Sequence, residues 1–187
     1  MILYEYPITT QIKDGKLVTL RPLRKSDKDA LLDYFRKLPP EERMCLKDDV
    51  TDEKVIERWI YDLDYDVVTP VVALDNGRIV ASATLHANPI GWTSHQGEVR
   101  ITCDLEYRKQ GLATILIENL IDIAQDFGME QLTAQVVPQL HQAYFLFEKL
   151  GFKEAGVLPG FVKDMKDNYD NLVLMVLDIR RQPGILN

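Results

Sequence analysis

The hydrophobic and polar positions of the chain follow two periods, one of two residues and one of three to four. Alternation of period two is typical of strands, and it recurs along the whole chain. The strands that it predicts cover residues 8–12, 17–20, 67–74, 78–85, 98–105, 132–137, 152–158 and 172–179. Apolar residues spaced three and four apart predict helices over residues 27–38, 52–63, 111–127 and 140–150. Together these elements predict a mixed α/β or α+β fold, in which helices cover a single sheet.

Turn and capping residues mark several of these boundaries. The dipeptides that indicate tight hairpin turns are Asp14-Gly15 and Asn76-Gly77. Ser26 and Thr51 are the expected N-caps of the first two helices, because a side-chain hydroxyl can accept a hydrogen bond from a free helix amide. We expect Pro39-Pro40 to end the first helix.

The composition is that of an ordinary globular protein. The chain has 187 residues, of which 46% are hydrophobic and 27% charged, so we expect one domain over residues 1–187. Its net charge of −7 disfavours nucleic acid as a partner, because duplex binding needs a surplus of cations. Two cysteines and no Cys/His cluster of zinc spacing predict neither a disulfide framework nor a metal site. Without a signal-peptide pattern or a long apolar segment, we expect a cytoplasmic protein that does not contact a membrane.

The segment with the clearest chemistry joins the strand at 98–105 to the longest helix. It reads Arg108-Lys-Gln-Gly-Leu-Ala113. The first amides of a helix lack partners within the helix, and the helix dipole places positive charge there, so such a loop can bind an anion. Gly111 and Ala113 would let a phosphate approach the backbone, and Arg108 and Lys109 add cations. The alternative is an ordinary strand–turn–helix connection with a solvated basic pair.

This segment resembles the signature of the GNAT superfamily of N-acetyltransferases, in which Arg/Gln-x-x-Gly-x-Gly/Ala joins a strand to a helix. Residues 108–113 match that signature, and residues 146–152 (LFEKLGF) are similar to the family's second motif. Residues 18–27 also look like the family's first strand and the entry to its first helix. The resemblance implies an acetyl-CoA-dependent N-acetyltransferase that needs no metal. It further implies a twisted, mostly antiparallel sheet of about seven strands flanked by about four helices.

The resemblance also implies which residues contact acetyl-CoA. In the family, backbone groups at the end of the strand pair with the pantetheine arm, and amides of the following loop hold the pyrophosphate. By position, the cofactor-binding residues are Cys103, Leu105, Arg108, Lys109, Gln110, Gly111, Leu112, Ala113 and Phe147, the last packing against the pantetheine arm. We expect Cys103 to be a buried apolar residue rather than a nucleophile, because no histidine lies near it at a spacing that suggests a base.

Acetyl transfer to an amine benefits from a base, because alkylammonium groups have a pKa near ~10.4. Glu98, at the head of the strand before the loop, matches the Glu that serves as base in several branches of the family, including bacterial protein-lysine acetyltransferases. Burial beside an acyl pocket is expected to raise the pKa of Glu98. The alternatives are that Glu98 is a surface carboxylate at the strand edge, or that Asp104 or Glu106, which are weaker candidates, takes its place.

The family's usual proton donor is a tyrosine, and Phe147 stands in its place here. Tyr144, one turn earlier, is a substitute only if the helix is rotated; otherwise the departing thiolate takes its proton from the amine or from water. The histidines expected to be wall, loop or capping residues are His86, His95 and His141. Leu140 also replaces an Asn that is common in the family. The alternative function is therefore a GNAT-fold acyl-CoA-binding or regulatory protein with weak or no catalysis.

Residues 48–66 carry eight carboxylates against Lys54 and Arg58. Because the first two helices and their loop build the acceptor side in the family, we expect this segment to face the acceptor. Its charge would attract a cationic primary amine, such as a protein lysine, a polyamine or an aminoglycoside. The alternative is a solvated helix face. Residues 160–164 with Tyr169-Asp170 are similar to segments of relatives near the protein-lysine branch, and the sequence leaves a homodimer open.

Overall fold

The computed structural model describes residues 5–164 and 166–180, and its strands form one sheet in the order β1-β2-β3-β4-β5-β6-β8-β7. The strands are β1 (Ile8–Gln11), β2 (Leu17–Pro22), β3 (Val68–Asp75), β4 (Arg78–Ala87), β5 (Gln96–Cys103), β6 (Gln131–Val136), β7 (Lys153–Lys163) and β8 (Tyr169–Asp178). The helices are α1 (Lys28–Lys37), α2 (Pro40–Arg43), α3 (Glu53–Tyr61), α4 (Leu112–Asp126) and α5 (His141–Lys149), with 3-10 turns at η2 (Lys25–Asp27) and η3 (Leu105–Tyr107).

The mixed fold expected from the sequence is confirmed. Every neighbouring pair of strands is antiparallel except β5 and β6. Within the described residues the sheet has eight strands rather than about seven, and the chain forms five α-helices rather than about four. The β3–β4 hairpin turns at Asn76-Gly77, where both residues have positive φ angles of 48° and 81°. This is the geometry that a two-residue hairpin turn requires.

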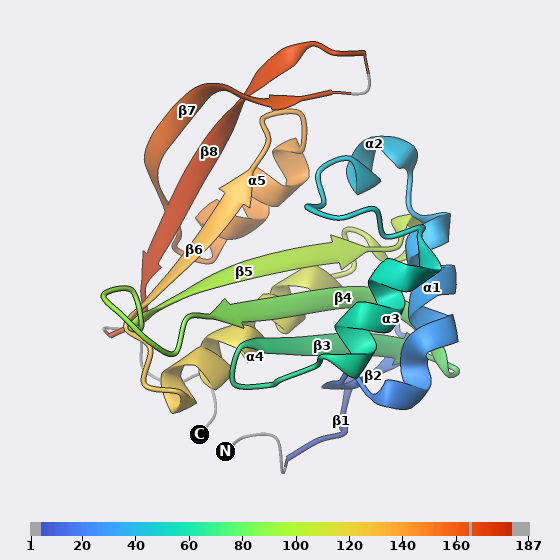
Figure 1. Ribbon diagram of the computed structural model, residues 1–187. Coiled ribbons are helices and arrows are strands. Elements are labelled where there is room, and N and C mark those ends of the chain that lie inside the picture. The colour runs from blue at the N-terminus through green and yellow to red at the C-terminus, as the bar shows by residue number, and fades with distance from the viewer. Residues whose placement is uncertain (1–4, 165, 181–187) are drawn as a thin grey trace.

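Helices cover both faces of the sheet, as Figure 1 shows with α1 and α3 in front of β3 and β4 and α4 behind them. The core is accordingly split in two. One cluster packs α1 and α3 against the front face of β3 and β4 around Ile56 and Val72, and the other packs α4 against the opposite face around Leu116 and Leu85. No helix in the part of the chain that is described is long and apolar enough to cross a membrane.

β5 and β6 form a fork. They pair in parallel over three residues each, Gln96 to Glu98 with Gln131 to Thr133. Beyond this point β6 continues its pairing with β8 as far as Val136, and β5 continues with β4 as far as Cys103. In Figure 1 the two strands meet at one end and diverge toward α2 and α5. The fork therefore leaves the side of β5 that faces β6 open over the second half of the strand.

Two helix starts differ from the expectation. Ser26 lies within the turn η2, and Asp27 rather than Ser26 is the residue before α1. Asp52 rather than Thr51 caps α3, where its carboxylate accepts a hydrogen bond from the Lys54 amide. In both places an aspartate follows the hydroxyl residue and stands at the cap position, but only Asp52 accepts a capping hydrogen bond with its side chain. The chain after α1 also forms the short helix α2, because Pro40 suits the first position of a helix.

Asp27 joins the first helix to the sheet through a buried ion pair. Arg21 of β2 donates two hydrogen bonds to its carboxylate, at 2.6 and 2.9 Å, and the Arg24 amide donates a third at 2.8 Å. Burial raises the pKa of Asp27, but the bonds from Arg21 and Arg24 outweigh it, and the pKa lies below the usual aspartate value. The ionised carboxylate is therefore part of the folded state.

We expect Asp27→Asn to lower the free energy of unfolding by about 2–3 kcal/mol, because it leaves Arg21 buried without its charged partner. Urea denaturation measures this, with Asp29→Asn as the control, since the Asp29 side chain is 90% exposed. Because folding lowers the pKa of Asp27, its contribution is complete above the unfolded pKa and is lost as pH falls through the folded one. Equal stability of the two variants at neutral pH would contradict this role.

Candidate functional site

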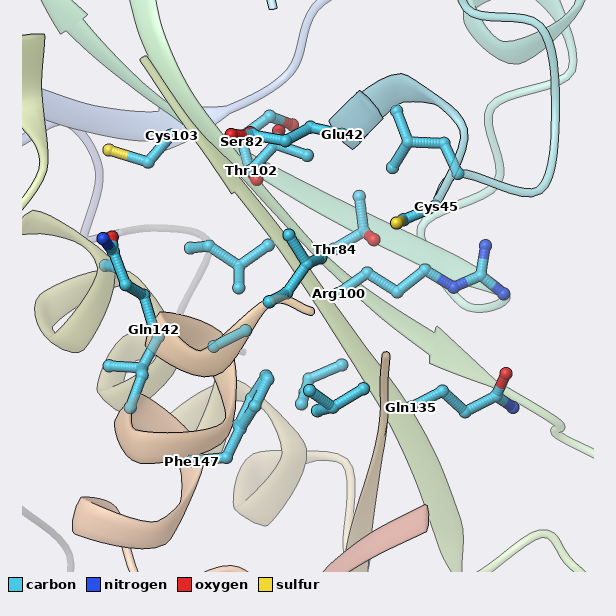
Figure 2. Close-up of a pocket in the computed structure, with 18 of the residues that line it drawn as sticks. Glu42, Cys45, Ser82, Thr84, Arg100, Thr102, Cys103, Gln135, Gln142 and Phe147 are labelled. Carbon is cyan, nitrogen blue, oxygen red and sulfur yellow. Dashed lines mark hydrogen bonds between the residues drawn. The ribbon is translucent and has the colours of Figure 1, made fainter. Parts of the chain in front are cut away.

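A cleft of about 2180 Å³ opens at the fork between β5 and β6. Its walls come from the second half of β5, the loop and first turn of α4, α5, the segment around α2, and the distal parts of β7 and β8. Figure 2 shows Phe147 and Gln142 of α5 on one side of β5, and Thr84, Arg100 and Cys45 on the other. The cleft thus passes through the fork and reaches both faces of the sheet.

The start of α4 faces this cleft with free backbone amides. Gly111 is the N-cap of α4 and adopts the left-handed conformation, with φ of 88°, two residues after Lys109 with φ of 60°. Within the described chain, no hydrogen-bond acceptor contacts the amides of residues 109–114, whereas the next amide, Ile115, donates to the Gly111 carbonyl. Free amides and the positive end of a helix dipole are the groups with which helix N-termini bind anions, so the start of α4 is a candidate anion site.

The open side of β5 supplies a second set of backbone groups. The Asp104 amide donates to the Val80 carbonyl of β4. Since hydrogen-bonded and non-hydrogen-bonded pairs alternate between antiparallel strands, the backbone groups of Ile101 and Cys103 point the other way, into the fork. Leu105 lies beyond the strand in η3, and its carbonyl accepts the Arg108 amide. Ile101, which the sequence analysis did not single out, therefore occupies the open edge in place of Leu105.

Arg108 turns its side chain away from the free amides. Its Nε and Nη2 donate to the Cys103 carbonyl at 3.1 and 2.9 Å, and Nη2 also binds Glu42 of α2 at 2.5 Å. Arg108 therefore ties the end of β5 to α2. Lys109 is exposed, and the Gln110 carbonyl accepts the Lys13 amide at 3.0 Å.

Glu98 lies at the base of the fork, where it is the last β5 residue that pairs with β6. Lys47 Nζ contacts both of its carboxylate oxygens at 3.1 and 3.2 Å, Arg100 Nε donates to one oxygen at 2.7 Å, and Gln135 Nε2 reaches the other at 3.4 Å. Burial raises the pKa of Glu98, but Arg100 and Lys47 outweigh it, and the pKa lies below the usual glutamate value. The expectation of a raised pKa is therefore wrong, and Glu98 is ionised at neutral pH.

His86 of β4 is directly opposite Glu98 and lines the same cleft. Burial, with the nearby charge of Arg100, lowers the pKa of His86 to about 4. Its Nε2 lies 3.0 Å from the Thr84 hydroxyl. At neutral pH the ring is uncharged, so it is a polar wall of the cleft, as the sequence suggested, and adds no cation beside Glu98.

The residues considered as proton donor or nucleophile lie in three different settings. Phe147 is buried and packs edge-on against Phe152, with ring centroids 5.0 Å apart. Tyr144 is absent from the cleft wall, and its hydroxyl donates to Glu154 of β7 at 3.4 Å. Burial raises the pKa of Cys103 to about 12, so its sulfur stays a thiol at neutral pH. A thiol with so high a pKa is a poor nucleophile.

The acidic segment 48–66 is divided between the cleft and the structure around it. Of its eight carboxylates, those that line the cleft are Asp48, Asp62 and Asp64. Glu53 and Glu57 instead bind Lys28 of α1 at 2.8 and 3.2 Å. Outside the segment, Glu41 also lines the cleft. Only these three carboxylates of the segment are therefore placed to face an acceptor in the cleft, rather than all eight.

Comparison with known proteins gives a consistent result. The model of the Acetyltransferase (GNAT) family matches residues 28–152. The chain is 37% identical over 65 residues to an N-alpha-acetyltransferase of Saccharolobus solfataricus, covering 34% of this chain and 39% of that protein. It is 33% identical over 79 residues to a ribosomal-protein alanine N-acetyltransferase of Escherichia coli, covering 42% and 53%. The chain thus matches about half or less of the length of these curated relatives.

Solved structures share the fold over most of their length. A GNAT-family acetyltransferase from Streptococcus pneumoniae superimposes with a TM-score of 0.77 at 20% identity, covering 86% of this chain and 99% of that one. A protein from Salmonella typhimurium, solved with its cofactor acetyl-CoA, superimposes with a TM-score of 0.75 at 18% identity, covering 89% and 96%. At such identities the likeness establishes the fold.

The two neighbouring cations of the loop differ in their structural role, and stability measurements should separate them. We expect Arg108→Met to lower the free energy of unfolding by about 1–3 kcal/mol, because the Cys103 carbonyl and Glu42 lose their donor. Lys109→Met should leave it nearly unchanged, since the Lys109 side chain is exposed. Urea denaturation of both variants gives the comparison, and similar losses would refute the bracing role of Arg108.

Proposed function

Because the chain belongs to the GNAT family of acetyltransferases, we propose that it is an N-acetyltransferase that moves an acetyl group from acetyl-CoA to a primary amine. The observation that carries the proposal is the meeting of two sets of open backbone groups in one cleft. These are the free amides at the start of α4 and the open edge of β5 at the fork. A long ligand fits these two sets if it has an anionic group for the free amides and an amide-bearing arm for the open strand edge.

The residues on the two walls fit the two halves of acetyl-CoA. The amides of the loop and first turn, which include Lys109, Gln110, Gly111, Leu112 and Ala113, would hold the diphosphate. The backbone of Ile101 and the amide of Cys103 would pair with the pantetheine arm, since the Cys103 carbonyl is already bound by Arg108. Phe147 would form part of the apolar wall of the arm. The strand from Cys103 to Glu98 is about 17 Å long at ~3.3 Å per residue, which suits an extended arm. When bound, acetyl-CoA supplies the acetyl group activated as a thioester.

Glu98 at the end of this edge would receive the amine. Its carboxylate already binds one primary ammonium, that of Lys47, at 3.1 Å. Asp48, Asp62 and Asp64 add negative charge around the same cleft, which favours a cationic acceptor such as a protein lysine, a polyamine or an aminoglycoside. The two curated relatives are named for acetylation of α-amines or of a ribosomal-protein alanine, which supports an amine as the acceptor class.

We assign to Glu98 the role of general base. In its ionised form it accepts a proton at a carboxylate oxygen, directly or through one water, from the attacking ammonium. Its lowered pKa makes it a weak base that nevertheless is always in the proton-accepting form at neutral pH. Among the described residues, Tyr107 is the one tyrosine on the cleft wall, and its hydroxyl donates to Asp75 at 2.5 Å. The leaving thiolate would therefore take its proton from the amine or from water.

Measurement of CoA release with a panel of primary amines tests the proposed function. We expect turnover with at least one cationic amine. Tight binding of acetyl-CoA without turnover on any protein lysine, polyamine or aminoglycoside would favour the second candidate, an acyl-CoA-binding or regulatory protein. Phe147 in the place of the family's usual tyrosine, and Leu140 in the place of its common Asn, are the residues that support this second candidate.

Substitution of Gly111 tests the anion site. The φ of 88° at Gly111 is strained for a branched side chain by about 1–3 kcal/mol, so Gly111→Val should displace the amides and weaken CoA binding by at least about tenfold. Gly77→Val is the matched control, because Gly77 has a similar φ of 81° but lies in the β3–β4 hairpin. Calorimetric titration with CoA compares them. Unchanged affinity of the Gly111 variant would contradict the assignment of the loop.

Substitution of Glu98 tests the base. We expect Glu98→Gln to lower kcat/KM by about 100-fold at neutral pH, because the variant cannot accept the proton. Since the pKa of Glu98 is lowered, the wild type should lose the contribution of Glu98 only when pH falls through that low value. Glu106→Gln is the control, because the Glu106 side chain is 73% exposed outside the fork. A pH–rate profile for each variant is the measurement, and an unaltered kcat/KM in the Glu98 variant removes it as base.

A further inference from the structure

Lys47 lies where an acceptor amine would lie. It belongs to the segment between α2 and α3, lines the cleft, and holds its Nζ within 3.2 Å of both carboxylate oxygens of Glu98. In the part of the chain that the structure describes, it is the only lysine that forms an ion pair with Glu98; the other partner is Arg100. The chain therefore brings one of its own primary amines to the proposed base.

A purely structural role explains this contact less well. The Lys47 side chain is 49% exposed, and ion pairs of such exposure contribute little to stability, about 0–1 kcal/mol. Arg100 already neutralises Glu98 with a bond of 2.7 Å. His86, the titratable group across the strand, is uncharged at neutral pH and does not compete for the carboxylate. Lys47 is therefore not needed to compensate Glu98, and its amine can leave the carboxylate at small cost.

We propose that Lys47 is itself an acetyl acceptor, modified within its own chain at the base of the fork. The proposal rests on the proposed function, because the acetyl group comes from a bound acyl thioester. The open edge of β5 leads from the α4 loop to Glu98, so an arm lying along it ends beside the Nζ of Lys47.

The step balances as an ordinary aminolysis. Nζ loses one proton to Glu98 or to water and attacks the acetyl carbonyl carbon. The nitrogen–carbon bond forms, and the carbon–sulfur bond breaks. The sulfur leaves with the bonding electron pair, and the second proton of the former ammonium neutralises the thiolate directly or through water. The product is an uncharged ε-amide, which can no longer form an ion pair with Glu98, so the carboxylate becomes free for an external amine.

The experiment incubates the full chain with isotope-labelled acetyl-CoA and no other amine, followed by peptide mapping. We expect one acetyl group per chain, on Lys47, at a first-order rate that does not change with protein concentration. Lys47→Arg keeps the cation beside Glu98 and should abolish the label. Lys37→Arg is the matched control, because Lys37 is exposed on α1 outside the cleft. In this variant Lys47 should become acetylated to the same extent as in the wild type.

The other outcomes are distinguishable. Turnover on an external amine with no label on Lys47 overturns this inference and leaves the proposed function standing. Label spread over exposed lysines, and retained after heat denaturation, means chemical acetylation only and overturns the inference. A rate that rises with protein concentration means transfer between chains and overturns it as well. If the chain neither binds acetyl-CoA nor releases CoA with any amine, the proposed function fails first.

A second readout needs no thioester. An amine-reactive acetylating reagent of low molecular weight should modify Lys47 more slowly than Lys37 in the wild type, because Glu98 holds the Lys47 ammonium. In Glu98→Gln the two rates should become similar. Equal rates in the wild type would show that Glu98 does not hold Lys47 and would contradict the placement on which the inference depends.

Discussion

The loss of pairing between β5 and β6 is the constraint on which the rest of the site depends. After three residue pairs the strands separate, and each continues with a partner on its other side. An edge in the middle of a sheet exposes backbone donors and acceptors that a neighbouring strand would otherwise satisfy. Because α4 begins beside the same gap, its free amides and the open edge of β5 face one cleft. Glu98, the last paired residue, lines that cleft at the point where the pairing ends.

Features set by short stretches of sequence were predictable. The hairpin at Asn76-Gly77 and the position of α4 after the 108–113 loop follow from turn chemistry and periodicity, and both are present. The predicted caps at Ser26 and Thr51 were wrong: Asp52 caps α3 in place of Thr51, and Asp27 stands at the cap position of α1 without a capping hydrogen bond from its side chain. The Asp27 carboxylate instead binds Arg21, which lies on β2, so a pattern confined to the helix start does not show this contact.

Features set by contacts between distant residues were out of reach of the sequence. Lys47 and Glu98 are 51 residues apart, and Arg108 and Glu42 are 66 apart, so no local spacing indicates either contact. The sequence analysis predicted the wrong direction for the pKa shift of Glu98 for the same reason. Burial alone raises the pKa of a carboxylate, and the sequence argument had no means of placing two cations beside it.

The segment from Glu42 to Lys47 connects the two ends of the cleft. Glu42 holds Arg108, and Arg108 in turn holds the Cys103 carbonyl at the far end of the open edge. Five residues later, Lys47 contacts Glu98 at the base of the fork. Because the connection between these two anchors is short, a displacement of the segment large enough to withdraw Lys47 from Glu98 also pulls on Glu42. In the proposed function this one segment therefore adjoins both the place of the amine, at Glu98, and the end of the edge along which the donor would lie.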